Sequence, residues 1–154
     1  MNVLFVCLGN SCRSPMAEGI LKQLFIEHQL EGKIESAGFE SVQTDGSPNE
    51  KAVKVSAIHG IDIRAKRARK FNQSDFDAFD RIFVMDQKNL NDIMQVTRND
   101  NDKMKVDYLL NLIEPGENIQ VSDPYNGGVV SYEHTFQTIE PACIALVNKI
   151  KNTK

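Results

Sequence analysis

The chain has 154 residues, of which 41% are hydrophobic and 25% are charged, and its formal net charge is −3. This length suits one domain, residues 1–154, with a sizeable core. The charge balance argues against nucleic-acid binding, no apolar run is long enough to span a bilayer, and the first residues lack the basic segment of a signal peptide. We therefore expect a cytoplasmic protein that binds neither nucleic acid nor membrane.

Strands and helices alternate from the first residues onward. The continuous apolar run 2–7 predicts a buried parallel strand. Ser14 and Pro15 predict the start of a helix that reaches about residue 29, because Ser is a favoured N-cap and Pro a favoured first helical residue.

The rest of the chain continues this alternation. Further strands are predicted at 33–37, at 81–85 and in the apolar segment 106–113, and further helices at 49–59, at 87–97 and from about Ser131, with a kink at Pro141. We expect a polar loop over 98–105 and a solvated basic face over 64–70. The pattern predicts an α/β fold, a doubly wound parallel sheet with helices on both faces.

The segment from Cys7 to Ser14 joins the first predicted strand to the first helix, the place where open α/β sheets bind ligands. Backbone N–H groups that converge there, together with the helix dipole, bind a phosphate-like anion. We expect Gly9 to adopt a backbone conformation closed to other residues, and Arg13 to contact two phosphate oxygens through its planar guanidinium.

The same surroundings favour the thiolate form of Cys7, with Ser14 as a hydrogen-bond donor to it. A thiolate beneath a bound phosphate dianion is a nucleophile for phosphoryl transfer. The alternative is that Cys7 is a small buried hydrophobic residue and Arg13 a surface cation. The three cysteines and three histidines show no metal-ligand spacing, so we expect neither a metal nor a cofactor.

A phosphate ester with a poor leaving group also needs a proton donor. Asp123 is the best candidate, because it lies with Pro124 in a Pro- and Gly-containing loop before the last predicted helix. The alternative is that Asp-Pro simply forms a turn here.

These residues resemble the low-molecular-weight protein tyrosine phosphatases. The likeness is carried by the run from Cys7 to Glu18, and by residues 36–38, 76–80, 85–86 and 123–125. It implies a four-stranded parallel sheet and a two-step hydrolysis without metal. Cys7 would form a phosphocysteine with the phosphoryl group of a phosphotyrosine protein. Asp123 would protonate the leaving oxygen and then activate water.

The resemblance also assigns roles around the nucleophile. The phosphoryl oxygens would be held by the Arg13 side chain and by the loop amides of Leu8, Gly9, Asn10, Ser11, Cys12, Arg13 and Ser14. Asn10 would brace the loop, Tyr125 would form a wall for an aromatic substrate, and Cys12 would pair with Cys7 under oxidation. The expected partner is a phosphorylated protein, and the expected state a monomer or weak dimer.

Three positions depart from the family pattern. Many tyrosine-specific members carry Ile where this chain has Ser11, and arginine-phosphatase relatives carry Thr there. Many members have an aromatic residue where Val42 falls, and Lys66 replaces a His that often braces the loop. We therefore expect Ser11, Val42 and Tyr125 to set substrate specificity, and a protein-arginine phosphatase is the main alternative.

Two further alternatives are weaker. A thioredoxin-coupled arsenate reductase needs additional cysteines in a mid-chain loop, whereas the one remaining cysteine, Cys143, falls in the last predicted helix. A non-catalytic module that only binds phosphoryl groups would be expected to lack the nucleophile or the acid, and both Cys7 and Asp123 are present.

Overall fold

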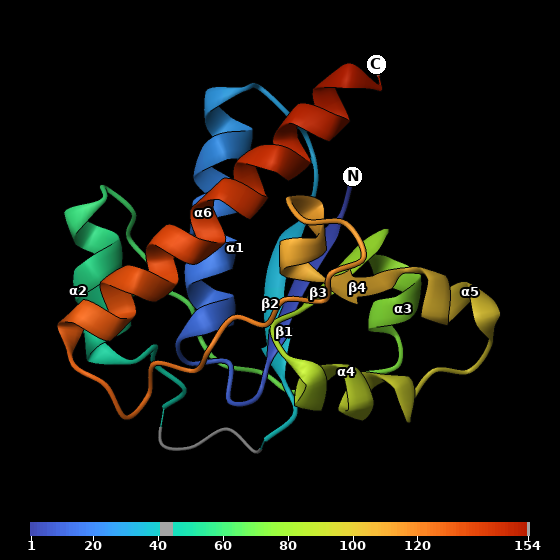
Figure 1. The fold of residues 1–154 in the computed structure, drawn as a ribbon, viewed down its shortest axis with the longest axis horizontal. Coiled ribbons are helices and arrows are strands. Elements are labelled where there is room, and N and C mark those ends of the chain that lie inside the picture. The colour runs from blue at the N-terminus through green and yellow to red at the C-terminus, as the bar shows by residue number, and fades with distance from the viewer. Residues whose placement is uncertain (41–44, 154) are drawn as a thin grey trace.

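The sheet has four parallel strands, which confirms the predicted fold class. The computed structural model describes residues 1–40 and 45–153, so Val42 lies outside the described residues. The strands are β1 (Val3–Cys7), β2 (Ile34–Gly38), β3 (Arg81–Val84) and β4 (Val106–Tyr108), in the spatial order β2-β1-β3-β4. β1 is central and pairs with β2 on one side and β3 on the other, as Figure 1 shows.

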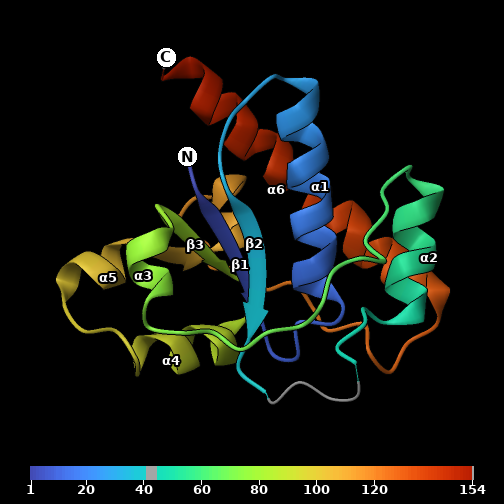
Figure 2. The same cartoon turned by 180° about the vertical axis from the view of Figure 1, so that it is seen from behind.

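Helices cover both faces of this sheet, and successive side chains of β1 point to opposite faces. Val3, Phe5 and Cys7 pack in one cluster with α1 (Arg13–Glu27), α2 (Glu50–Ile58) and α6 (Val129–Asn152). Leu4 and Val6 pack in a second cluster on the side of α3 (Asp75–Ala78) and α4 (Gln87–Met94). Figure 2 shows the two layers from behind. Burial on both faces explains why β1 is apolar throughout.

Two short helices differ from the prediction. The expected loop 98–105 contains α5 (Asp100–Met104), whose N-cap Asn99 accepts a hydrogen bond from the Asp102 amide at 2.8 Å. α3 was also not predicted. Helices of four and five residues show no helical repeat in the sequence, and their polar capping residues resemble a loop.

Several element boundaries differ from those predicted from the sequence. α1 begins at Arg13 with Cys12 at its N-cap, so Ser14 lies inside the first turn and is not the predicted cap. The Ser14 hydroxyl bonds to Cys7 instead. The apolar segment 106–113 divides into β4 and a 3₁₀ helix, η1 (Leu109–Leu112). α6 starts at Val129, two residues before the predicted start, and runs unbroken past Pro141.

The basic stretch 64–70 is not the simple solvated face that we expected. Lys66 is 13% exposed at its side chain and forms an ion pair with Glu18 at 3.2 Å. Arg69 bonds to Asp75 at 3.0 Å and to Glu35 at 3.1 Å. These two cations therefore tie the stretch to α1, β2 and α3, and they supply the partners that the buried carboxylates of Glu18 and Asp75 require.

The arrangement places the Cys7–Ser14 loop at the carboxyl edge of the sheet. β1 ends at Cys7 and α1 starts at Arg13, with β2 and β3 on either side of β1. The chain therefore reverses its winding beside this loop, where open sheets form ligand crevices. Among residues 1–40 and 45–153, no helix is long and apolar enough to cross a membrane.

Candidate active site

The Cys7–Ser14 loop ends in an uncapped helix. The Cys12 side chain makes no capping hydrogen bond, and the first turn of α1 contains no acidic residue. The first N–H groups of a helix have no partner within the helix, and the dipole makes this end positive. The loop therefore leads into an end of α1 suited to an external anion.

Asn10, and not Gly9, takes the unusual backbone conformation in this loop. Asn10 has φ 52°, in the left-handed region, whereas Gly9 does not have a left-handed φ. A Cβ at Gly9 would meet only Ser11 Oγ at 3.7 Å and Glu40 Oε2 at 3.8 Å. The expectation for Gly9 is therefore wrong. Asn tolerates this region better than most residues, and its side chain is anchored on both sides.

The glycine that the loop requires is Gly38, at the end of β2. A Cβ at this position would lie 2.7 Å from the carbonyl oxygen of Leu8 and 2.9 Å from the amide nitrogen of Asn10. Real Cβ atoms do not approach backbone so closely, so only glycine lets β2 support the loop from below. Sequence reasoning matched Gly38 to the family without finding this role.

A buried hydrogen-bond network braces Asn10. Asn10 Oδ1 accepts from the Arg69 amide at 3.1 Å, which turns Nδ2 toward two serines. Nδ2 donates to Ser14 Oγ at 2.8 Å and to Ser36 Oγ at 2.9 Å. Ser36 Oγ donates in turn to Glu18 Oε1 at 2.6 Å.

Lys66 closes this network on the side away from Cys7. Its Nζ lies 3.2 Å from Glu18 Oε1 and donates to the Ser36 carbonyl at 2.8 Å. Burial lowers the pKa of Lys66 below its ordinary value, although Glu18 opposes this shift. Lys66 thus supports the loop indirectly, through Glu18 and Ser36.

The network leaves the Ser14 hydroxyl able to donate to Cys7. Ser14 Oγ lies 2.9 Å from Cys7 Sγ. Because Ser14 Oγ already accepts from Asn10, its own hydrogen is available for the Cys7 sulfur.

Arg13 is held by Asp86, which sequence reasoning matched to the family without assigning it a role. Arg13 Nη1 donates to Asp86 Oδ2 at 2.7 Å and to the Val121 carbonyl at 2.8 Å. The Arg13 side chain is 3% exposed and that of Asp86 22% exposed. Asp86 also caps α4, since its Oδ1 accepts from the Asn89 amide at 2.8 Å. Asp86 therefore fixes the guanidinium at the sheet edge.

Asp123 and Tyr125 lie at the mouth of the site. Asp123 Oδ2 is 3.7 Å from Arg13 Nη2, and the Asp123 side chain is 45% exposed. Its Oδ1 accepts from the Tyr125 amide at 3.0 Å, so the turn predicted as an alternative is also formed. The Tyr125 ring is exposed, as a wall for a substrate would be.

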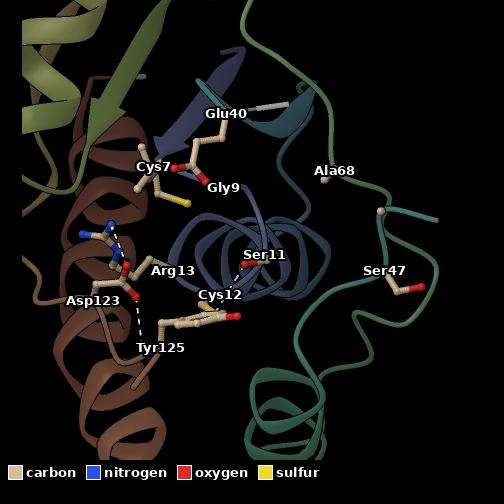
Figure 3. Close-up of a pocket in the computed structure, with 12 residues that line it drawn as sticks. Cys7, Gly9, Ser11, Cys12, Arg13, Glu40, Ser47, Ala68, Asp123 and Tyr125 are labelled. Carbon is tan, nitrogen blue, oxygen red and sulfur yellow. Dashed lines mark hydrogen bonds and ion pairs between the residues drawn. The ribbon is translucent and has the colours of Figure 1, made fainter. Parts of the chain in front are cut away.

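These side chains share one cavity of 370 Å³, shown in Figure 3. The cavity brings together the sequence-predicted Cys7, Arg13, Asp123, Ser11, Cys12 and Tyr125, with Leu8 and Gly9. Asn10 and Ser14 are buried behind it. Sequence reasoning missed Glu40, Gly46, Ser47 and Ala68, which also line the cavity. No group of three or more potential metal-ligating side chains occurs in the described part of the chain.

Cys12 is a second buried thiol on the cavity wall. Burial raises the pKa of Cys12, although its hydrogen bonds with Tyr132 and Ser11 oppose this shift. Cys12 Sγ lies 3.6 Å from the Tyr132 hydroxyl, and both side chains are almost fully buried. Cys12 is therefore a neutral thiol at neutral pH.

Comparison with known proteins identifies the family. A family model described as low molecular weight phosphotyrosine protein phosphatase matches residues 2–154. The chain belongs to this family. Among curated relatives, the low molecular weight protein-tyrosine-phosphatase YfkJ of Bacillus subtilis is 35% identical, covering 100% of this chain and 98% of YfkJ.

Solved structures of family members have the same fold. A protein tyrosine phosphatase from Entamoeba histolytica, with Hepes in its active site, superposes with a TM-score of 0.90 at 30% identity, covering 99% of this chain and 98% of that one. The YwlE arginine phosphatase of Bacillus subtilis, as a mutant with a phosphorylated active-site serine, gives a TM-score of 0.87 at 24% identity, covering 98% and 96%. At that identity the likeness to YwlE shows the fold alone.

Proposed function

We propose that this phosphatase hydrolyses phosphotyrosine in proteins through a phosphocysteine intermediate on Cys7. The observation that carries the proposal is the hydrogen bond between Cys7 Sγ and Ser14 Oγ at 2.9 Å, at the base of a cavity that also holds Arg13 and Asp123. The family supports phosphatase activity, and residues 1–154 would act as one domain without a metal or cofactor.

The first step transfers the phosphoryl group to sulfur. The Cys7 thiolate attacks phosphorus and forms a P–S bond while the bond from phosphorus to the tyrosine oxygen breaks. Asp123, protonated at this stage, gives its proton to that oxygen, so tyrosine leaves as a neutral phenol. Arg13 and the N–H groups at the start of α1 stabilise the charge on the phosphoryl oxygens.

The second step restores the enzyme. Asp123, now a carboxylate, accepts a proton from water as the water oxygen attacks phosphorus. The P–S bond breaks, Cys7 leaves as a thiolate, and inorganic phosphate is released. The exposed Tyr125 ring stacks against the substrate ring, and aromatic pairs of this kind contribute about 1 kcal/mol.

Hydrolysis of phosphoarginine is the second candidate, and Ser11 favours it. Ser11 lines the cavity, where its hydroxyl can accept a hydrogen bond from a guanidinium. An arsenate reductase is less well supported, because Cys143 is fully buried in α6 and cannot act as a relay thiol without local unfolding. A module that binds without catalysis would not need the hydrogen bond to Cys7.

Two variants test the proposal. Cys7→Ser should abolish turnover while keeping phosphate or vanadate binding, because the loop and Arg13 remain. Asp123→Asn should slow hydrolysis of a phosphotyrosine peptide by about 10²- to 10⁴-fold, and less for aryl phosphates whose leaving group needs no proton. Residual hydrolysis by Cys7→Ser, or an equal loss for every leaving group in Asp123→Asn, would contradict the assigned roles.

A further inference from the structure

Glu40 places an acidic side chain beside the phosphate-binding loop. It follows β2, and its amide donates to the Leu8 carbonyl at 3.0 Å, next to the Phe39 amide bond to the same oxygen at 2.9 Å. These bonds hold the Glu40 backbone against the loop. The carboxylate lines the cavity, and its Oε2 lies 3.8 Å from where a Cβ on Gly9 would be.

Among the residues that the structure describes, no cation is paired with this carboxylate; Lys88, which lines a neighbouring hollow with Glu40, pairs with Asp92 at 3.0 Å. Within residues 1–40 and 45–153, no Lys, Arg or His forms an ion pair with Glu40, and residues 41–44 are Ser, Val, Gln and Thr. Of the described cavity-lining residues, Arg13 alone is cationic, and it is held by Asp86 and the Val121 carbonyl. The rim thus carries two acidic side chains, Glu40 and Asp123.

Such a rim is unfavourable for a simple phosphate ester. A carboxylate beside an anion-binding loop repels the phosphoryl dianion, and like-charge repulsion lowers both affinity and association rate. A substrate that carries its own positive charge near the phosphoryl group would convert this repulsion into attraction. Asp123 has a role in proton transfer, whereas Glu40 has none in the proposed chemistry.

We propose, on the basis of the proposed function, that Glu40 is a specificity-determining residue that selects phosphoproteins with a guanidinium or ammonium group beside the phosphoryl group. Figure 3 shows Glu40 on one side of the Cys7 sulfur and Asp123 with Tyr125 on the other. With a phosphotyrosine ring against Tyr125, we expect a neighbouring residue of its peptide to reach Glu40 on the other side of the sulfur. An Arg or Lys there supplies the charge, and so does the guanidinium of phosphoarginine itself.

The test compares matched peptides and variants. Phosphotyrosine peptides flanked by Arg, Gln or Glu, and a phosphoarginine peptide, are assayed for kcat/KM with wild type and Glu40→Gln. Glu31→Gln is the control, because it removes the same charge from an exposed site at the opposite edge of the sheet. Wild type should prefer the Arg-flanked over the Glu-flanked peptide by about two- to fivefold, the size of one partly exposed charge pair.

Removing the charge of Glu40 should change kcat/KM in opposite directions for the Arg-flanked and the Glu-flanked peptides. Glu40→Gln should lower kcat/KM for the Arg-flanked peptide and raise it for the Glu-flanked one, and added salt should weaken the wild-type preference. A merely structural role would change both rates in the same direction, and that result would overturn the proposal. Phosphoarginine turnover that exceeds that of every phosphotyrosine peptide, and falls in Glu40→Gln, would identify the guanidinium of phosphoarginine as the selected cation.

Peptide binding to the Cys7→Ser variant tests the role of Glu40 independently of the proposed function. If no phosphotyrosine peptide is hydrolysed, the proposed function fails, but a lower Kd of Cys7→Ser for the Arg-flanked than for the Glu-flanked peptide still supports selection by Glu40. Equal Kd values for the two peptides, or a Kd difference that Glu40→Gln leaves unchanged in the Cys7→Ser background, would overturn it.

Discussion

Asp86 gives a sharp test of how the site is held, because its two carboxylate oxygens have different partners. Oδ2 accepts from Arg13 Nη1 at 2.7 Å, and Oδ1 accepts from the Asn89 amide at 2.8 Å. Asp86→Asn removes the charge opposite Arg13 but keeps a side-chain oxygen for the helix cap, since Asn caps helices as well as Asp. Asp86→Ala removes both interactions.

The exposure of the pair sets the expected magnitude. Breaking a fully buried ion pair costs about 3–5 kcal/mol, and an exposed pair contributes about 0–1 kcal/mol. Arg13 is 3% and Asp86 22% exposed, so the Arg13–Asp86 pair lies between these limits. We expect Asp86→Asn to lower the free energy of unfolding by about 1–3 kcal/mol, and Asp86→Ala by about 1 kcal/mol more.

Activity should fall with the loss of this restraint. Arg13 would keep the more distant Asp123, at 3.7 Å, as its carboxylate partner, and a misplaced guanidinium stabilises the transition state less well. We expect kcat/KM for a phosphotyrosine peptide to fall about 10- to 100-fold, which corresponds to about 1.4–2.7 kcal/mol. Urea unfolding and steady-state kinetics measure the two effects.

Asp92→Asn is the matched control, because it removes the same charge from α4 and breaks only the ion pair with Lys88 at 3.0 Å. It should change stability by less than about 0.5 kcal/mol and leave kcat/KM unchanged. Equal kinetics of wild type and Asp86→Asn would refute a positioning role for Asp86. Equal stability of Asp86→Asn and Asp86→Ala would refute its contribution as a cap.

Three further predictions concern the loop and its supports. Gly38→Ala should lower the free energy of unfolding by about 1–3 kcal/mol and reduce kcat/KM, because a Cβ 2.7 Å from the Leu8 oxygen displaces the loop. Unchanged thermal unfolding and unchanged kinetics would disprove this. Lys66→Met should lower the free energy of unfolding by about 1 kcal/mol near neutral pH, because Glu18 loses its buried partner and keeps the more exposed Lys22 at 2.7 Å. Burial holds the pKa of Lys66 in the folded protein below 10.5, so between these two pKa values the unfolded chain binds more protons than the folded one. The free energy of unfolding of wild type should therefore rise relative to that of Lys66→Met as the pH increases from the lowered pKa toward 10.5. Urea unfolding at several alkaline pH values checks the sign. Cys12→Ser should keep most turnover but recover less activity with reductant after peroxide, and full recovery would exclude a protective disulfide with Cys7.

The sequence predicted those features that depend on local pattern. The apolar run of β1 and the spacing of Cys7 and Arg13 around a strand–helix junction were sufficient to locate the loop between β1 and α1. The conformation within the loop was predicted wrongly, because the left-handed φ falls on Asn10, whose side chain bonds to Ser36 and to the Arg69 amide. Those partners lie 26 and 59 residues further along the chain.

The roles of Asp86 and Glu40 were missed for a related reason. Asp86 lies 73 residues from Arg13 in the sequence, so its contact depends on the order of strands in the sheet. Glu40 has no motif of its own and gains significance only from its place in the cavity. The short helices α3 and α5 were missed because a single turn has too few residues to show a helical repeat.

The buried network around Asn10 has a consequence for the end of the catalytic cycle. The bonds from Lys66 through Glu18 and Ser36 to Asn10 are all made between protein groups, so they hold the loop in one shape whatever oxyanion it receives. A site prepared in this way is as complementary to free orthophosphate as to the phosphoryl group of a substrate. Orthophosphate should therefore be a competitive product inhibitor, and its departure a candidate for the slow step with the best substrates.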